Sequence, residues 1–255
     1  MDAADLCQKA READAVVVAG GDGTVRSVAG QLVGMAAPLA IVPTGTENLA
    51  AREHGFMVRL PVLLAALEAR QVREVDVGVV NGESFLVMAS VGMDASVVEV
   101  VQASRRGPIT RWSYAWPVVQ QVVSWRGTGC RVVVDGKVAF QGAGQVVVAN
   151  SPHYAARLNP VRWADAADGR LDVLVLPAAS SVGLAWWAGR MVLPGWDGRG
   201  AVRAAGQRVT VELDAPVPVQ VDGDPAPAAA KLDLLVRPRA LRLLKVVPGT
   251  PVPGF

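Results

Sequence analysis

The stretch AVVVAGGDGTVRSVAGQLVGM, residues 15–35, decides the architecture expected for the first part of the chain. Residues 15–19 are an apolar, β-branched run, which is typical of a buried strand, and the run ends at the glycine-rich turn Gly20–Gly23. Apolar residues then recur at helical spacing over residues 25–32. The order strand, glycine turn and helix is typical of an α/β unit whose turn lies at the carboxyl end of its strand.

The same order of elements repeats further along the chain. A second strand is predicted at residues 39–42, and it ends at the turn Pro43–Thr46, which leads into a helix-like segment at residues 47–53. Another helix is predicted for residues 61–70. Strands that alternate with helices predict a parallel sheet covered on both faces, with both turns at the same edge of the sheet.

From about Glu74 the chain consists mainly of short β-rich pieces separated by turn signals such as Asn81-Gly82 and Asp135-Gly136, which predict hairpins. Two helical segments interrupt the strands, and the Ala/Pro-rich residues 225–230 are expected to form a loop. The two helical segments are residues 112–125 and 182–196. We therefore predict an α/β lobe over residues 1–74 and a larger, antiparallel β lobe over residues 75–237, with residues 238–255 a candidate for returning to the first lobe.

The composition excludes several classes of protein. A length of 255 residues fits two small domains, and 51% hydrophobic against 19% charged residues excludes disorder of the whole chain. Twenty-five basic and 23 acidic residues give a net charge of +2, which argues against dedicated nucleic-acid binding. Cys7 and Cys130 lack metal-ligand spacing and are expected to be reduced thiols in a cytosolic protein. No apolar run approaches the roughly 18–20 residues of a membrane span.

The glycine-rich turn GGDGT, residues 20–24, has the features of a phosphate site. Glycines let the backbone approach a ligand, and the free N–H groups and dipole of the following helix favour phosphate. The alternative is a tight turn whose glycines only supply positive φ. A second loop, Thr44–Asn48, in the equivalent position of the next unit favours a ligand site between the two. No GK[ST] motif occurs, which excludes a P-loop ATPase.

GGDGT followed by PTGTENLAAREHG, residues 43–55, resembles the diacylglycerol kinase catalytic family, which also includes sphingosine kinases, ceramide kinases and bacterial lipid kinases. The resemblance continues in the family's order and covers roughly residues 14–245. Its later segments are residues 81–99, 107–122, 149–176 and 219–227.

The resemblance implies an α/β nucleotide-binding lobe with a parallel sheet and a larger antiparallel β-sandwich lobe. It implies an ATP-dependent lipid kinase of phospholipid metabolism that uses Mg²⁺ and phosphorylates the hydroxyl of a diacylglycerol-like or sphingoid lipid. Such a protein is expected to be cytoplasmic and peripheral at the inner membrane surface; a homodimer is left open. Two alternatives are a catalytically incompetent nucleotide- or lipid-binding relative and an NAD kinase-like or phosphofructokinase-like enzyme, since these enzymes also use GGDGT.

The resemblance also assigns roles to single residues. Thr46 matches a nucleotide contact in the second loop, and Asp224 falls where the family usually has a Glu that acts as general base. The residues that match the nucleotide loop are Gly20, Gly21, Asp22, Gly23, Thr24, Val25 and Arg26. Asp168 matches the side-chain ligand of a structural Mg²⁺, which Asp165 and the backbone near Arg170 would complete.

From the residues alone, plainer interpretations stay open. Asp168 can belong to an ordinary Asp-Gly turn, and Asp224 can be a solvated neighbour of the hairpin turn Asp222-Gly223. The Trp-rich residues 182–196 fit a membrane-facing surface or, equally, a buried helix. His54 and His153 have no triad or zinc spacing and are expected to be structural or surface residues.

The chain also departs from the family pattern. Members normally begin with an additional strand, a phosphate-contacting loop, a helix and a second strand before the equivalent of GGDGT, and we expect a start codon assigned too late to explain the difference. Glu47 stands where many relatives carry a small residue, and Asp224 is one methylene shorter than Glu.

Overall fold

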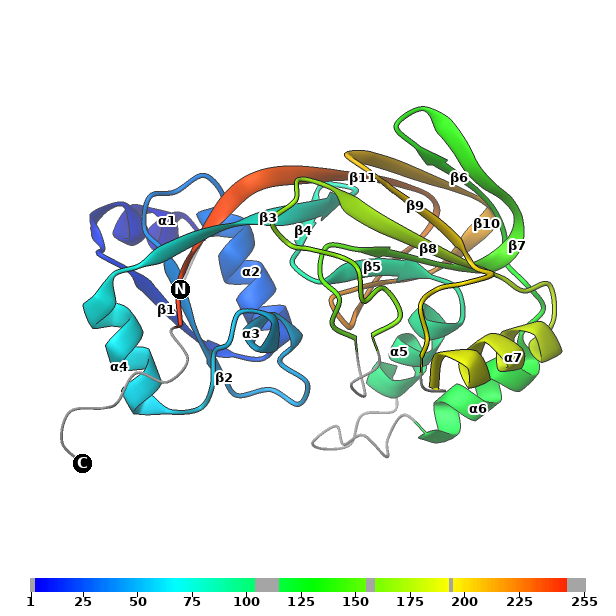
Figure 1. Cartoon of the computed structure of the whole chain (residues 1–255), viewed down its shortest axis with the longest axis horizontal. Helices are drawn as coiled ribbons and strands as arrows, with labels where there is room; N and C mark the ends of the chain where they lie inside the picture. Colours follow the sequence, from blue (N-terminus) through cyan, green and yellow to red (C-terminus); the bar gives the residue numbers. More distant parts are fainter. Residues whose placement is uncertain (1–2, 104–114, 155–158, 193–194, 247–255) are drawn as a thin grey trace.

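The computed structural model describes residues 3–103, 115–154, 159–192 and 195–246. An N-terminal α/β region and a larger β-rich region lie next to each other, and two long strands connect them (Figure 1). These strands are β3 (Val72–Val80) and β11 (Asp224–Leu244). All eleven strands belong to one hydrogen-bonded sheet.

The N-terminal region confirms the predicted alternation of strands and helices. Strands β1 and β2 pair in parallel, from Val16 opposite Leu39 to Gly20 opposite Pro43. The end of β11 adds to β2 in parallel through Leu243, but β11 is antiparallel to β3, so the sheet of this region is mixed. Its other elements are α1 (Ala3–Glu12), β1 (Val16–Gly20), α2 (Asp22–Leu32), β2 (Leu39–Pro43), α3 (Leu49–Glu53) and α4 (Leu60–Ala69).

Helix α2 begins earlier than the sequence pattern suggests. Gly21 is its N-cap, so Asp22 lies in the first turn, where a negative charge interacts favourably with the helix dipole. The helix buries Val25, Ala29 and Leu32 against the core, as its apolar spacing predicts. Helix α3 is short, because Asn48 before it adopts a left-handed conformation with φ of 49°.

The β-rich region is antiparallel, as predicted. Asn81-Gly82 and Asp135-Gly136 have positive φ at both residues, and so does Asp222-Gly223, which fits tight hairpin turns. The elements of this region are β4 (Glu83–Phe85), β5 (Met88–Val91), β6 (Gly129–Val134), β7 (Lys137–Ala149), β8 (Leu171–Pro177), β9 (Val202–Gly206) and β10 (Arg208–Val221).

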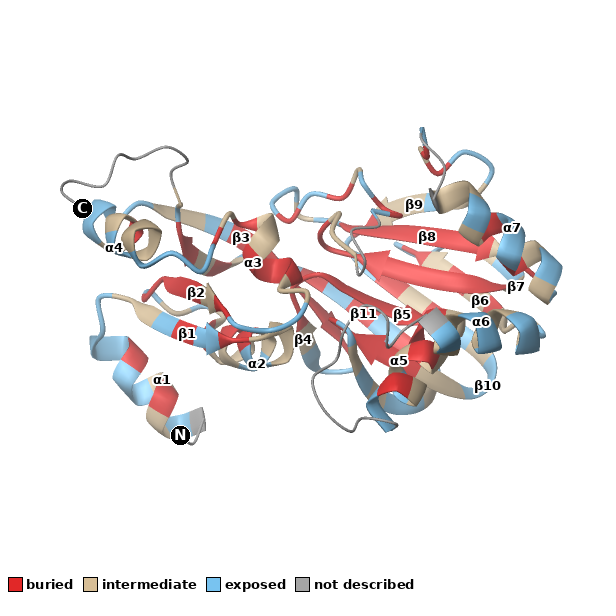
Figure 2. Ribbon diagram, turned by 90° about the horizontal axis from the view of Figure 1, so that it is seen from below, coloured by how far each residue is buried: buried red, intermediate tan, exposed pale blue. Residues whose placement is uncertain are grey.

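Strands β7 and β10 curl the sheet around a core. Each of them pairs with both β5 and β6, so the sheet folds over an apolar cluster that includes Val146, Val148 and Val173. The alternate residues Val147 and Leu174 point to the opposite face and join a second cluster. The central strands are therefore buried on both faces (Figure 2).

The loop predicted for residues 225–230 is wrong, because these residues form the start of β11. On one side they pair with β10, with Pro225 opposite Gln220. Pairing of β11 with β3 begins only at Leu234, so the prolines lie on an edge where a missing N–H removes no ladder hydrogen bond.

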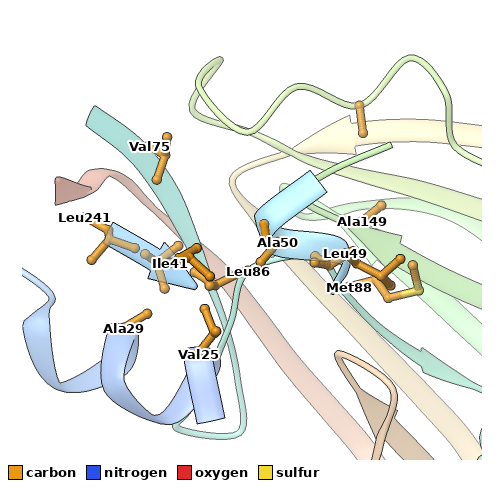
Figure 3. Close-up of a cluster of buried hydrophobic side chains, with 14 of the residues drawn as sticks. Val25, Ala29, Ile41, Leu49, Ala50, Val75, Leu86, Met88, Ala149 and Leu241 are labelled. Carbon is orange, nitrogen blue, oxygen red and sulfur yellow. The ribbon is translucent and has the colours of Figure 1, made fainter. Parts of the chain in front are cut away.

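Three helices cover one face of the central strands (Figure 1). They are α5 (Met93–Ala103), α6 (Ala115–Ser124) and α7 (Ser181–Val192). The first residues of the predicted helix 112–125 and the C-terminal tail lie outside the described residues. The second apolar cluster continues from α2 and β2 through α3 to β5 and β7. Ile41 and Leu86 lie on one side of Ala50 of α3, and Leu49 and Met88 lie on the other (Figure 3).

Candidate active site

The two glycine-containing loops contact each other through their backbones. A Cβ atom on Gly45 would lie 2.6 Å from the Cα of Gly21, and one on Gly21 would lie 3.3 Å from the Cα of Gly45. Gly21 has φ of −86°, and neither Gly20 nor Gly45 has positive φ. The interpretation that these glycines supply positive φ is therefore wrong. Gly21 and Gly45 are required because two backbones approach closely, whereas a Cβ on Gly20 would meet the side chain of Thr24.

Asp22 joins the two loops. Its Oδ1 accepts a hydrogen bond of 3.2 Å from the N–H of Ala50 in α3. Asn48 closes the second loop, since its Oδ1 accepts the N–H of Gly45 at 2.8 Å and its Nδ2 donates to the carbonyl of Gly45 at 2.7 Å. Burial raises the pKa of Asp22 to about 6, and the nearby carboxylate of Asp222 adds to this effect.

The structure places Asp224, the predicted base, against the first turn of α2. Its carboxylate occupies the space that a Cβ on Gly23 would need. Arg26 binds Asp224 at 3.3 Å, binds Glu83 at 3.0 Å and donates to the carbonyl of Val221 at 3.0 Å. Arg26, predicted as a nucleotide contact, thus holds the β10–β11 hairpin beside the glycine loop.

The remaining residues of the predicted nucleotide site differ in orientation. Thr24 and Thr46 are exposed, on α2 and on the second loop. The side chain of Val25 is buried in the core, and its N–H donates to the carbonyl of Gly21. Val25 therefore has neither its side chain nor its N–H free for a ligand.

Asp222 is a site residue that sequence reasoning did not find. Its carboxylate accepts three backbone hydrogen bonds, from Leu86 and Val87 at 2.8 Å and from Met88 at 2.9 Å. Burial raises its pKa, and these N–H donors oppose the rise. The sequence offered only an Asp-Gly turn signal, because the partners lie more than 130 residues away.

An apolar cavity of about 310 Å³ extends from the loops to the space under α5, α6 and α7. Leu174 and Val147 of the sheet form part of one wall, and Val118 and Leu184 of the helices form part of the other. Glu47 of the second loop and Gly223, next to Asp224, also line it. The cavity therefore reaches the second loop and the residue next to the predicted base.

Asp94 lies on the cavity wall at the centre of a buried polar network. Its carboxylate accepts hydrogen bonds from Ser90 and Gln145, both at 2.5 Å, and from the hydroxyl of Tyr154 at 2.9 Å. Burial raises the pKa of Asp94, while these donors oppose the shift. Sequence reasoning did not single out these residues, because their polar side chains resemble surface positions.

Gln220 connects this network to the hairpin that carries Asp224. Its Nε2 donates to the Ser90 hydroxyl at 2.9 Å, and its Oε1 accepts the N–H of Gly223 at 2.7 Å. Asp94, Ser90, Gln220 and Gly223 therefore form a continuous chain of hydrogen bonds from the cavity wall to the hairpin.

The predicted structural-metal residues share one turn. Asp165 accepts the N–H of Ala167 and Asp168 accepts the N–H of Arg170, both at 3.0 Å, while the Arg170 guanidinium reaches the carbonyl of Ala205. The two carboxylate oxygens of Asp76 hold the turn to β11 by accepting the N–H groups of Gly169 and Arg239.

The charge around Asp168 is suited to a cation, but the ligand set is incomplete. Burial raises the pKa of Asp168, and the carboxylates of Asp165 and Asp76 raise it further. Within the described residues, no three Asp, Glu, His or Cys side chains are grouped so that they could hold a metal ion. Asp168 fits a site that backbone oxygens and water would complete.

His153 also has a partner that its sequence position did not reveal. Its Nδ1 lies 2.8 Å from Glu53 of α3, and the Ser151 hydroxyl donates to the same carboxylate at 3.1 Å. Burial lowers the pKa of His54 to about 3, as expected for a neutral structural histidine. These contacts tie α3 to the segment after β7.

Two family models match the chain. Residues 1–80 match the diacylglycerol kinase catalytic domain, and residues 87–245 match the YegS C-terminal NAD kinase beta sandwich-like domain. The fold and the paired loops thus define a two-part protein of the kind found in these kinases. The chain belongs to the diacylglycerol kinase catalytic family.

Relatives support the same assignment. A Pseudomonas aeruginosa protein named "Probable lipid kinase YegS-like" is 31% identical over 239 residues, which are 89% of this chain and 75% of the relative. The Bacillus subtilis protein named "Diacylglycerol kinase" is 30% identical over 67% of this chain and 57% of its own length. A Synechocystis relative is matched over only 40% of its length, so the chain spans about half the length of several relatives.

Solved structures show the same fold. A diacylglycerol kinase structure from Bacillus anthracis has a TM-score of 0.74 at 21% identity, covering 97% of this chain and 83% of that one. An NAD kinase from Archaeoglobus fulgidus in complex with ATP has a TM-score of 0.52 at 16% identity. Among the helices of the described residues, none has the length and apolarity to cross a bilayer.

Proposed function

We propose that this chain transfers the γ-phosphoryl group of ATP to a lipid hydroxyl, with Mg²⁺ as the cation. One observation carries the proposal: the touching loops, the carboxylate of Asp224 and one end of the apolar cavity all meet at the β10–β11 hairpin. Such a site brings a phosphate donor, a base and an apolar acceptor together, which phosphoryl transfer requires.

In this proposal each group has a defined task. Backbone N–H groups at the start of α2 and in the second loop bind the phosphates of ATP, with Gly21 and Gly45 leaving space for them. Asp224 accepts the proton of the acceptor hydroxyl while the hydroxyl oxygen bonds to the γ-phosphorus. The bond from that phosphorus to the β–γ bridging oxygen breaks, and ADP leaves. Arg26 orients the carboxylate of Asp224.

Two carboxylates would hold cations. Mg²⁺ bound with ATP neutralises the negative charge that develops on the phosphates, and Asp22 is the carboxylate at the loops that would hold it. Asp168, with backbone oxygens near Arg170, would hold the structural cation. In both places burial is the largest cause of the raised pKa, and a bound cation would stabilise the ionised carboxylate.

The acceptor is proposed to be a diacylglycerol-like or sphingoid lipid. The cavity lining is aliphatic apart from a few polar groups, so it suits a hydrocarbon chain. Asp94 and Tyr154 offer polar atoms in that wall. Glu47, where many relatives carry a small residue, adds a carboxylate to the lining of the cavity at the second loop.

Incubation with γ-labelled ATP, Mg²⁺ and a panel of lipid alcohols tests the proposal, and we expect one or more labelled lipids. Binding of ATP without any transfer would favour an incompetent relative, and label in NADP instead of a lipid would favour an NAD kinase-like enzyme. Gly21→Asp supplies the nucleotide control. Its side chain would press against Gly45, so calorimetry should show lost ATP binding in a folded protein.

A further inference from the structure

Helices α6 and α7 present an apolar face to solvent. On α6 the exposed residues follow the spacing i, i+3 and i+7, and on α7 the spacing i and i+4, so each set lies on one side of its helix. The exposed fractions are 67% for Trp116, 50% for Val119, 72% for Val123, 77% for Val182 and 55% for Trp186. The two helices pack together (Figure 1). We call these five side chains the α6–α7 face.

The opposite sides of the same helices line the apolar cavity. Val118 of α6 and Leu184, Ala188 and Met191 of α7 face inward. Trp187 is buried beside them, although its neighbour Trp186 is exposed. A single layer of helices therefore separates the cavity from an apolar outer surface. For the Trp-rich segment, the inner side of α7 fits the buried helix and the outer side fits the exposed surface that the sequence analysis left open.

The charges on α6 and α7 and directly after α6 are all positive. Residues 115–126 and 181–192 contain no Asp or Glu, while Arg126 is exposed after α6 and Arg190 lies 5.7 Å from the ring centroid of Trp186. Tryptophan rings with neighbouring arginines are typical of groups at the boundary between lipid headgroups and acyl chains. Anionic lipids attract such arginines when they lie near the membrane surface.

A second exposed apolar group lacks these features. Met57, Val58, Leu60 and Leu64 are exposed on and before α4, in the other region of the molecule. Neither of the two main cavities of the described residues is lined by them. Helix α4 also carries the acidic Glu68. This group is therefore the matched control for the α6–α7 face.

We propose that the α6–α7 face docks on the surface of an anionic lipid bilayer, so that a lipid leaving the bilayer has only this helical layer to pass before it reaches the cavity. The passage of an acceptor rests on the proposed kinase function, whereas the docking itself does not. Bilayer binding and phosphorylation can therefore be measured separately.

Co-sedimentation with vesicles of phosphatidylcholine, with and without phosphatidylserine, tests docking in the absence of ATP. We expect binding to the anionic vesicles, and a loss of affinity of at least about tenfold in the double variant Trp116→Ser/Trp186→Ser. The control Leu60→Ser/Leu64→Ser should bind like the wild type. Thermal unfolding should be similar in both variants, because the replaced side chains are exposed.

Several results would overturn the proposal. These are unchanged vesicle binding in the tryptophan variant, loss of binding in the α4 control, or equal binding to neutral and anionic vesicles. Sedimentation velocity without lipid tests another occupant. If the wild type forms a dimer and the tryptophan variant does not, the α6–α7 face would instead bind a second copy of the chain. Vesicle binding without lipid phosphorylation would leave docking intact and contradict only the proposed function.

Discussion

Two Asp-Gly turns in this chain are each anchored by a buried aspartate, and they stand in different surroundings. At Asp222-Gly223, the buried Asp222 anchors the turn by accepting three backbone N–H groups of residues 86–88. At Asp168-Gly169, the buried Asp76 anchors the turn by accepting the N–H groups of Gly169 and Arg239. In both, a buried aspartate holds an exposed or half-exposed aspartate in place.

The difference lies in what each turn faces. The first turn places Asp224 beside the glycine loop and the apolar cavity, and its partner is the cation Arg26. The second places Asp168 among the carboxylates of Asp165 and Asp76, which raise its pKa. Similar local sequences thus lead to a proposed base in one place and a proposed cation ligand in the other. The environment decides the chemistry of each carboxylate.

The largest effect is expected from removing the anchor of the first turn. Asp222→Ala would leave three buried N–H groups without an acceptor, and we expect it to lower the free energy of unfolding by about 3–5 kcal/mol. Asp135→Ala is the matched control, because Asp135 has a similar positive φ and also accepts backbone N–H groups, those of Gln207 and Arg208, but in an exposed turn. Urea unfolding measures both.

Equal losses of unfolding free energy in the two variants would contradict this prediction, because they would show that burial of the hydrogen bonds of Asp222 adds nothing to stability. If Asp222→Ala does not fold, Asp222→Asn gives the same comparison. It keeps one acceptor oxygen, so its loss should lie between those of the wild type and the alanine variant.

The next largest effect separates the two exposed aspartates by kinetics. Asp224→Asn should lower kcat by about 10²–10⁴-fold with little change in ATP affinity, because only the acceptance of the acceptor proton is removed. Asp224→Glu should retain or raise kcat, since the longer side chain restores the family's usual residue. Glu83→Gln, which changes the other carboxylate on Arg26, is the control and should retain most activity. Full activity in Asp224→Asn would remove this residue from the mechanism.

A smaller effect tests how the first turn influences the loops. Burial and Asp222 raise the pKa of Asp22 from 3.8 to about 6, so the folded state binds this proton more tightly than the unfolded state. The free energy of unfolding therefore falls as the pH rises from about 4 to about 6, because Asp22 must give up this proton in the folded state. Asp22→Asn lacks this cost and should gain stability relative to the wild type across that window, by at most about 3 kcal/mol.

Urea unfolding at several pH values between 4 and 8 measures this difference. Asp14→Asn, at an exposed carboxylate, supplies the baseline. A difference between Asp22→Asn and the wild type that does not vary with pH would contradict the assignment of the pKa shift to Asp22.

The smallest effect concerns the second turn. If Asp168 holds Mg²⁺, a Mg²⁺ concentration a few times the dissociation constant should stabilise the wild type by about 1 kcal/mol and raise Tm by roughly 2–4 °C. Asp168→Ala should lose this rise. Sodium chloride at matched ionic strength controls for screening. A wild-type Tm that does not respond to Mg²⁺ would contradict the structural cation.

Part of the site could be predicted from the sequence. The glycine loops were located correctly, but the sequence left open whether their glycines supply positive φ or allow a close approach, because the approach of Gly21 to Gly45 depends on how β1 and β2 pair. Asp224 was assigned through a family resemblance, since an Asp after a hairpin has no signal of its own. Asp222 and Asp94 were missed, because buried polar residues look like surface residues until their donors are known.

The sequence by itself determined the local structure. The β-branched run of β1, the helical spacing of α2 and the Asp-Gly hairpins were readable, because periodicity and backbone preference act over a few residues. The tertiary structure alone decided which distant groups meet. Arg26 reaches Asp224 across 198 positions of sequence, and Tyr154 reaches Asp94 across 60. Such contacts depend on the order and register of the strands, and this order places β11 between β2 and β10. No local sequence pattern encodes it.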